Sequence, residues 1–142
     1  MPTAASESRT QVFFMLLSAA VFAYFGFAMS WAHQYTGPGS PTPNVLIPMV
    51  AVLKWTLRAA AVGFGVAALV AMAQPRIGSL LYSVTGLVTA IAFLVVAIWE
   101  WTNPQGYFSG VPAILLLIFA AWNGYGSWAG LREAMERRQT AP

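Results

Sequence analysis

The chain has 142 residues, of which 58% are hydrophobic and 8% are charged, and its formal net charge is +3. Ordinary soluble domains carry about 25% charged residues, and a soluble domain of this length has too little interior to hide so much apolar surface. It has no cysteine, which excludes disulfides, thiolate metal sites and cysteine nucleophiles. Its seven lysines and arginines are dispersed, so nucleic-acid binding is not expected. The composition predicts an integral membrane protein in contact with lipid.

Four apolar stretches are each long enough for the roughly 20 residues of helix that cross a hydrocarbon core. They lie at residues 12–31, 54–73, 77–101 and 111–131. Prolines and glycines, which do not continue a helix, predict outer loops at residues 32–44 and 102–110. A tight turn at residues 74–76 joins the middle two stretches, and a polar tail occupies residues 132–142. The expected fold class is an all-α membrane protein, with residues 1–142 forming a single four-transmembrane-helix up-down bundle.

The first apolar stretch has a competing interpretation as a cleavable signal peptide. Its apolar run is longer than the roughly 7–15 residues typical of such peptides, and Glu7 stands beside Arg9 in the preceding flank. The small residues Ala28 and Ser30 could mimic a cleavage site. We expect this stretch to be retained as a membrane helix.

The distribution of cations predicts the orientation. The side with both termini and the 74–76 turn carries five arginines: Arg9, Arg76, Arg132, Arg137 and Arg138. The two outer loops contain no lysine or arginine, although Lys54 and Arg58 lie nearer that side. The positive-inside rule therefore places both termini in the cytoplasm. We identify no targeting motif, so a bacterial plasma membrane is the expected location.

Tryptophans mark the expected membrane boundaries. Those near the outer boundary are Trp31, Trp55, Trp99 and Trp101. Tryptophan prefers the headgroup region because its ring is apolar and its N–H needs a partner, so an interfacial belt is the main interpretation. The alternative is an aromatic platform that binds a pigment, quinone or lipid.

Small residues in the second and fourth spans predict close helix packing. Membrane helices associate where small side chains let their backbones approach. The spacing occurs in three pairs: Ala59 with Gly63, Ala61 with Gly65, and Gly126 with Gly130. Packing within the bundle and a dimer interface both explain these pairs.

Three charged residues form a candidate intramembrane polar cluster. Lys54 and Arg58 are four residues apart on one helix face, and Glu100 is the only acidic residue near the outer side. Because the 74–76 turn makes the second and third spans antiparallel neighbours, we predict an ion pair between Glu100 and Arg58 or Lys54. Charges in a membrane are costly and usually paired. The cluster is either a structural clip between helices or an ion or proton site.

Four uncharged polar residues are candidates for hydrogen bonds between helices. Asn123 lies in the inner half of the fourth span, and three residues of the third span reach a similar depth: Ser83, Thr85 and Thr89. Such bonds contribute about 0.6 kcal/mol on average. Their expected role is to hold the helices together.

The sequence offers little for catalysis. His33 is the only histidine, the chain has no aspartate, and the nucleophile-elbow, phosphate-loop and zinc-protease motifs are missing. One histidine without cysteine makes no recognisable zinc site. We therefore expect no enzyme activity, no catalytic or cofactor-binding residues, no metal site and no cofactor. We recognise no family motif in the chain.

Three functions stay open, and all involve the lipid bilayer as a partner. The favoured one is a small noncatalytic accessory or scaffold subunit that packs against other membrane protein subunits. The alternative is a small channel or transporter, present as a homo-oligomer, that uses Lys54, Arg58 and Glu100. A membrane enzyme or cofactor carrier is the third, and it would need His33 or Glu100 to line a pocket.

Overall fold

The computed structural model describes residues 4–28, 46–102 and 110–139, and the regular structure in these ranges is helical. The first helix, α1 (Ala4–Ala23), continues into a π-helical turn, η1 (Tyr24–Ala28). The remaining helices are α3 (Leu46–Ala73), α4 (Pro75–Thr102) and α5 (Gly110–Gln139).

Four stretches of these helices are long and apolar enough to cross a membrane. They are Arg9–Ala28, Ala51–Ala73, Pro75–Trp99 and Ile114–Gln139. The prediction of an all-helical protein with four candidate membrane spans is therefore confirmed for the described residues.

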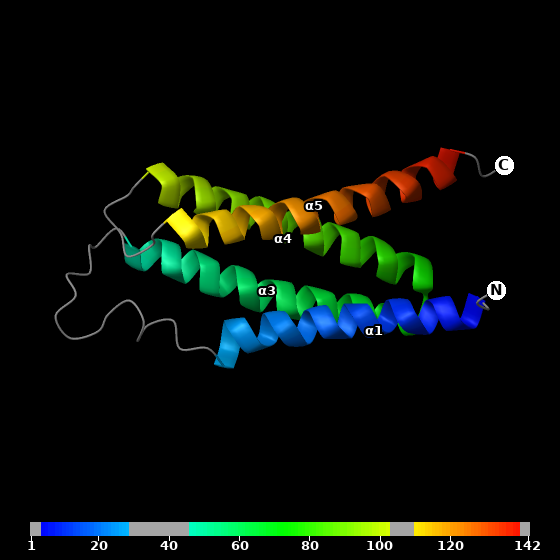
Figure 1. Cartoon of the computed structure of the whole chain (residues 1–142). Coiled ribbons are helices and arrows are strands. Elements are labelled where there is room, and N and C mark those ends of the chain that lie inside the picture. The colour runs from blue at the N-terminus through cyan, green and yellow to red at the C-terminus, as the bar shows by residue number, and fades with distance from the viewer. Residues whose placement is uncertain (1–3, 29–45, 103–109, 140–142) are drawn as a thin grey trace.

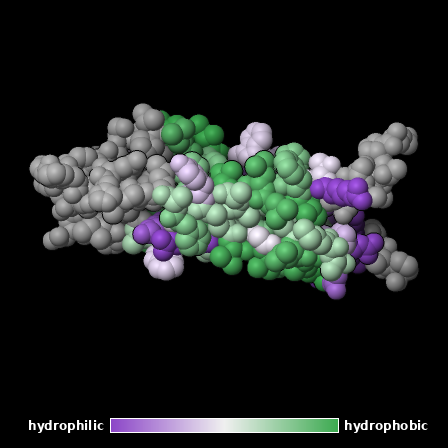
Figure 2. Space-filling model, turned by 90° about the horizontal axis from the view of Figure 1, so that it is seen from below, coloured by the Kyte–Doolittle hydropathy of each residue, from purple (hydrophilic) through white to green (hydrophobic). Residues whose placement is uncertain are grey.

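Helices that follow one another in the chain are neighbours in space. Helix α1 packs against α3, α3 against α4, and α4 against α5 (Figure 1). Figure 1 also shows the beginning of α1 and the end of α5 at the same end of the molecule. In Figure 2, apolar surface covers the middle of the molecule, and hydrophilic residues gather at the end that carries the termini. This banded surface suits a chain surrounded by lipid.

The helices extend beyond the apolar stretches. Helix α3 begins at Leu46 and includes Pro48 in its first turn, where a missing N–H breaks no helical hydrogen bond. Helix α5 continues through most of the polar tail to Gln139. Two exposed ion pairs with i,i+4 spacing support this extension: Arg132 with Glu136 at 2.8 Å, and Arg137 with Glu133.

Helices α3 and α4 form a hairpin around Gln74. The Gln74 N–H donates to the Val70 carbonyl at 2.7 Å, and the Gly78 N–H donates to the Gln74 carbonyl at 3.0 Å. Pro75 opens α4, where its fixed φ is already helical. A Cβ at Gly78 would clash with the backbone of Ala71, so only glycine permits this close approach.

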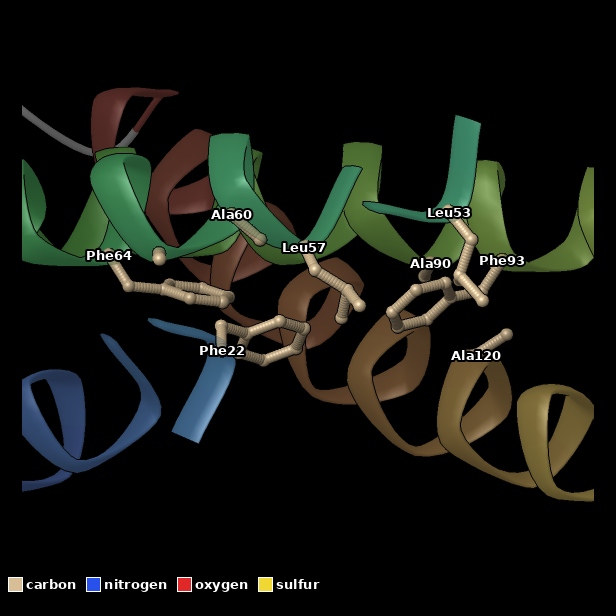
Figure 3. Packing of buried hydrophobic residues seen from close by; sticks show 9 residues of the cluster. Phe22, Leu53, Leu57, Ala60, Phe64, Ala90, Phe93 and Ala120 are labelled. Carbon is tan, nitrogen blue, oxygen red and sulfur yellow. The ribbon is translucent and has the colours of Figure 1, made fainter. Parts of the chain in front are cut away.

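The core is built from aromatic and small side chains of all four helices. Figure 3 shows residues of the larger cluster, which contains Phe22, Leu53, Leu57, Ala60, Ala61, Phe64, Ala90, Phe93 and Ala120. A second cluster contains Met15, Ala67, Ala68 and Ala71. Alanines on α3 and α4 let the helices approach, and the rings fill the remaining space.

Phe22 is the centre of the aromatic packing. Its ring centroid lies 5.2 Å from that of Phe64, 6.2 Å from Phe93 and 5.6 Å from Phe119. Phe93 and Phe119 are themselves 5.6 Å apart in an edge-on arrangement. Aromatic pairs at these separations contribute about 0.5–1.5 kcal/mol beyond burial. One residue of α1 thus joins α3, α4 and α5.

Candidate functional site

The Arg58 side chain connects α3 to the end of the first span. Its Nε–H donates to the Gly26 carbonyl in η1 at 2.9 Å. The backbones meet closely here, because a Cβ at Gly26 would lie 3.0 Å from the Arg58 nitrogen and 3.2 Å from the Leu57 carbonyl carbon. Carbonyls in the last turn of a helix lack partners within it and carry partial negative charge. The Arg58 guanidinium therefore supplies the Gly26 carbonyl with both a hydrogen-bond donor and a positive charge.

Two aromatic rings flank the same guanidinium. The Arg58 Cζ lies 4.9 Å from the centroid of Phe27 and 5.1 Å from that of Trp55. Both separations are within the roughly 6 Å of a cation–π interaction. The hydrogen bond and the rings together fix the position of the charge, whereas Arg58 remains only half-buried.

Lys54 lies one turn before Arg58 on α3 and is also half-buried. The two cations share a helix face, as their spacing predicts. The Glu100 side chain lies outside the described residues, so its ion pair with Arg58 or Lys54 stays a prediction. The described contacts of Arg58 instead run to a main-chain carbonyl and two rings, a role that the sequence analysis did not anticipate.

Two of the four polar candidates have described hydrogen bonds within their own helices. Thr89 Oγ1 donates to the Thr85 carbonyl at 2.8 Å, and Asn123 Nδ2 donates to the Phe119 carbonyl at 3.1 Å. Thr85 faces Gly63 of α3, where a Cβ would lie 2.6 Å from the Thr85 Cγ2 atom. The described geometry thus gives Thr85 a packing contact between helices.

Ser83 belongs to a seam of small residues between α4 and α5. A Cβ added at Gly130 would lie 2.5 Å from the Ser83 Oγ. A Cβ added at Gly86 would likewise clash with the Ser127 Oγ. Both serines are buried. Gly130 thus contributes to this seam, whereas Gly126, its partner in the predicted motif, faces open space.

A polar contact that the sequence analysis missed joins α1 to α4. Ser18 Oγ and Tyr82 Oη are 3.2 Å apart and share a hydrogen bond, and Ser18 Oγ lies 2.9 Å from the Phe14 carbonyl. The Tyr82 ring also packs on Phe64, with centroids 5.0 Å apart. No spacing rule pairs residues of two helices that are not consecutive in the chain, so the sequence carried no signal for this contact.

The described residues contain no group of three histidine, cysteine, aspartate or glutamate side chains that could hold a metal ion. His33 lies outside the described residues. The arrangement therefore provides a fixed, flanked positive charge near one end of the bundle and small-residue seams between its helices. No protein-family model, curated protein or solved structure matches the chain.

Proposed function

We propose that this chain is a noncatalytic membrane subunit that packs against other membrane proteins through an exposed face of α5. The observation that carries the proposal is the exposure of two large amphipathic side chains in its span. Trp122 is 82% exposed and Tyr125 is 80% exposed.

The depth of these two residues makes their exposure unusual. Trp122 lies ten residues before Arg132, and Tyr125 lies seven residues before it. These separations correspond to about 15 Å and 10 Å of helix. With Arg132 at the boundary of a hydrocarbon core about 30 Å thick, Trp122 lies near the midplane. An indole N–H or phenolic O–H has no acceptor among lipid tails, so a protein partner over this face would stabilise both groups.

The surrounding surface has the shape of a packing face. Leu115 and Ile118 are also exposed, and with Trp122 and Tyr125 they follow the alternating three- and four-residue spacing of one helix stripe. Gly126 adds open space beside the two rings, where another helix could approach closely. Only 11% of the α5 span is buried within the chain, against 17% of the first span and 39% of the spans in α3 and α4.

The proposal includes an up-down passage through a bacterial plasma membrane with both termini in the cytoplasm. The cation distribution supports this orientation, because five arginines belong to one side and the outer loops contain none. The oligomeric channel or transporter has weaker support. Arg58 donates to a main-chain carbonyl and lies close to two aromatic rings, which favours an anchoring role over one in a water-filled path.

Photo-crosslinking in the native membrane tests the packing face. A benzoyl-phenylalanine cross-linker in place of Trp122 is expected to give a discrete adduct with a second membrane protein. The matched control has the cross-linker in place of Leu69, which is exposed on α3. Mild-detergent extraction, native sizing and identification of the co-purifying chains would then name the partner.

The expected result is a stable hetero-assembly and a protein adduct that forms from position 122 but not from position 69. A homogeneous homo-oligomer with no other protein, or cross-linking to lipid alone from both positions, would refute the accessory-subunit function.

A further inference from the structure

We propose that Lys54 and Arg58 form a binding site for a phosphate group, that of a phospholipid headgroup in preference to free phosphate. The lipid would lie in the leaflet on the side opposite the termini. This site is separate from the α5 face and does not depend on the accessory-subunit function.

The acidic residues of the chain are too few near this site to neutralise both cations. Its four acidic residues are Glu7, Glu100, Glu133 and Glu136. Glu133 and Glu136 pair with arginines on the far end of α5, and Glu7 lies at the start of α1, at the same end of the molecule. Glu100 could neutralise one of the two cations. Glu100 carries a single negative charge, so Lys54 and Arg58 keep a net positive charge even if Glu100 contacts both, and uncompensated charge close to hydrocarbon is costly.

The position of the two cations along α3 matches the depth of lipid phosphates. Lys54 lies twenty residues before Gln74, or about 30 Å of helix, which is the thickness of a hydrocarbon core. Arg58 lies one turn deeper. A side chain at this depth extends toward the headgroups, where phosphate is the abundant acceptor. Trp55, between them in sequence and 64% exposed, suits the same interfacial layer.

The described contacts leave Arg58 with donors for a ligand. A guanidinium has five N–H groups in a fixed fork, and the described hydrogen bond to Gly26 uses only the one on Nε. Phe27 and Trp55 contact the guanidinium through their rings, with the Arg58 Cζ 4.9 Å and 5.1 Å from the two centroids. A guanidinium held in this way is prepared for two parallel hydrogen bonds to phosphate oxygens, with the Lys54 ammonium adding charge one turn away.

Native mass spectrometry of the full chain, with phosphatidylglycerol added to detergent micelles, tests the site. The Lys54→Gln variant is expected to bind one phosphatidylglycerol about fivefold more weakly than the natural chain, which corresponds to the loss of about 1 kcal/mol per cation near a headgroup. Lys54 is the first choice, because it takes no part in the hydrogen bond that holds η1. Arg58→Gln should weaken binding further, provided that the variant keeps its fold.

The control Arg76→Gln removes one positive charge at the opposite end of α3 and α4 and should leave binding unchanged. Diacylglycerol, which lacks the phosphate, should not bind at this site. If inorganic phosphate binds as tightly as the lipid, and its binding depends equally on Lys54, the natural ligand would be free phosphate and not a phospholipid. Equal phosphatidylglycerol binding by the natural chain, Lys54→Gln and a folded Arg58→Gln would overturn the proposal.

Discussion

Arg58 shows how one side chain can satisfy two demands of a membrane interior. A carbonyl near the end of a helix accepts a hydrogen bond readily, and an arginine within a span needs acceptors. The 2.9 Å bond from Nε to the Gly26 carbonyl meets part of both demands, and the Phe27 and Trp55 rings offer their π-faces to the charge. The hydrogen bond between Arg58 and Gly26 thus satisfies two polar groups and also holds η1 against α3.

Replacing Arg58 should therefore destabilise the bundle, whereas replacing Lys54 should not. We expect Arg58→Met to lower the free energy of unfolding by about 1.5–3 kcal/mol, the usual contribution of a hydrogen bond to a charged group. Lys54→Met, which removes the same charge without touching η1, is the control. Unfolding by sodium dodecyl sulfate in mixed micelles, followed by tryptophan fluorescence, measures both. Equal stability of the two variants would show that the η1 contact contributes little.

The elements are held together by close approach at particular glycines. Gly78 meets the Ala71 backbone across the α3–α4 hairpin, and Gly86 and Gly130 receive serines across the α4–α5 seam. Gly65 and Gly126, although equally small, face open space. Lipid tails are as apolar as the side chains, so contact distance rather than hydrophobicity decides which helices associate.

Two glycine-to-alanine substitutions distinguish glycines in close helix contacts from glycines that face open space. Gly78→Ala would force a methyl group into the Ala71 backbone and should cost about 1–3 kcal/mol, as overpacking usually does. Gly65→Ala adds the same methyl group to α3 with nothing within 4 Å, so it should be neutral or slightly stabilising. The same detergent titration compares them. If Gly78→Ala is as stable as Gly65→Ala, helices α3 and α4 can move apart at the hairpin without a loss in the free energy of unfolding.

The whole molecule has an uneven distribution of charge and of contact. Helices α3 and α4 form its interior, whereas α5 contacts chiefly α4 and presents much of its span outward. Charged residues gather at the C-terminal end of α5, where two ion pairs are exposed. This asymmetry is the basis both of the proposed packing face and of the proposed orientation.

The orientation can be measured directly, because the chain has no native cysteine. In whole cells, a membrane-impermeant thiol reagent should label Gln105→Cys in the second outer loop. It should label Gln139→Cys in the tail only after lysis. The reason is the excess of arginine on the side of the termini, which favours the cytoplasm. The reverse labelling pattern would invert the proposed topology.

The helical class and the number of candidate spans followed from the sequence with little ambiguity. A run of about 20 apolar residues needs a helix to satisfy its backbone in lipid. The proline and glycine content of residues 32–44 and 102–110 predicted interruptions of the helices. Helix α4 ends at Thr102 and α5 begins at Gly110. The sequence analysis gave residues 132–142 as a polar tail, and α5 continues through most of it, where the i,i+4 ion pair of Glu133 with Arg137 supports the helix.

The candidate site could be predicted only in part from the sequence. The shared face of Lys54 and Arg58 is a local property of one helix, so spacing was enough to find it. The acceptor of the described Arg58 hydrogen bond, the Gly26 carbonyl, belongs to another element and is a main-chain atom present in every residue. A sequence pattern cannot single out such an acceptor. The same limit applied to the contact of Ser18 with Tyr82.

The sequence by itself determined that the chain is helical and carries four candidate membrane spans, because hydropathy and backbone hydrogen bonding act along one segment at a time. Only the tertiary structure decided which small residues form seams, how Phe22 links the other three helices, and which side of α5 stays uncovered. These features depend on the rotation of each helix about its axis. That rotation is set by short-range packing between segments far apart in the chain, and hydropathy, nearly uniform around these helices, does not specify it.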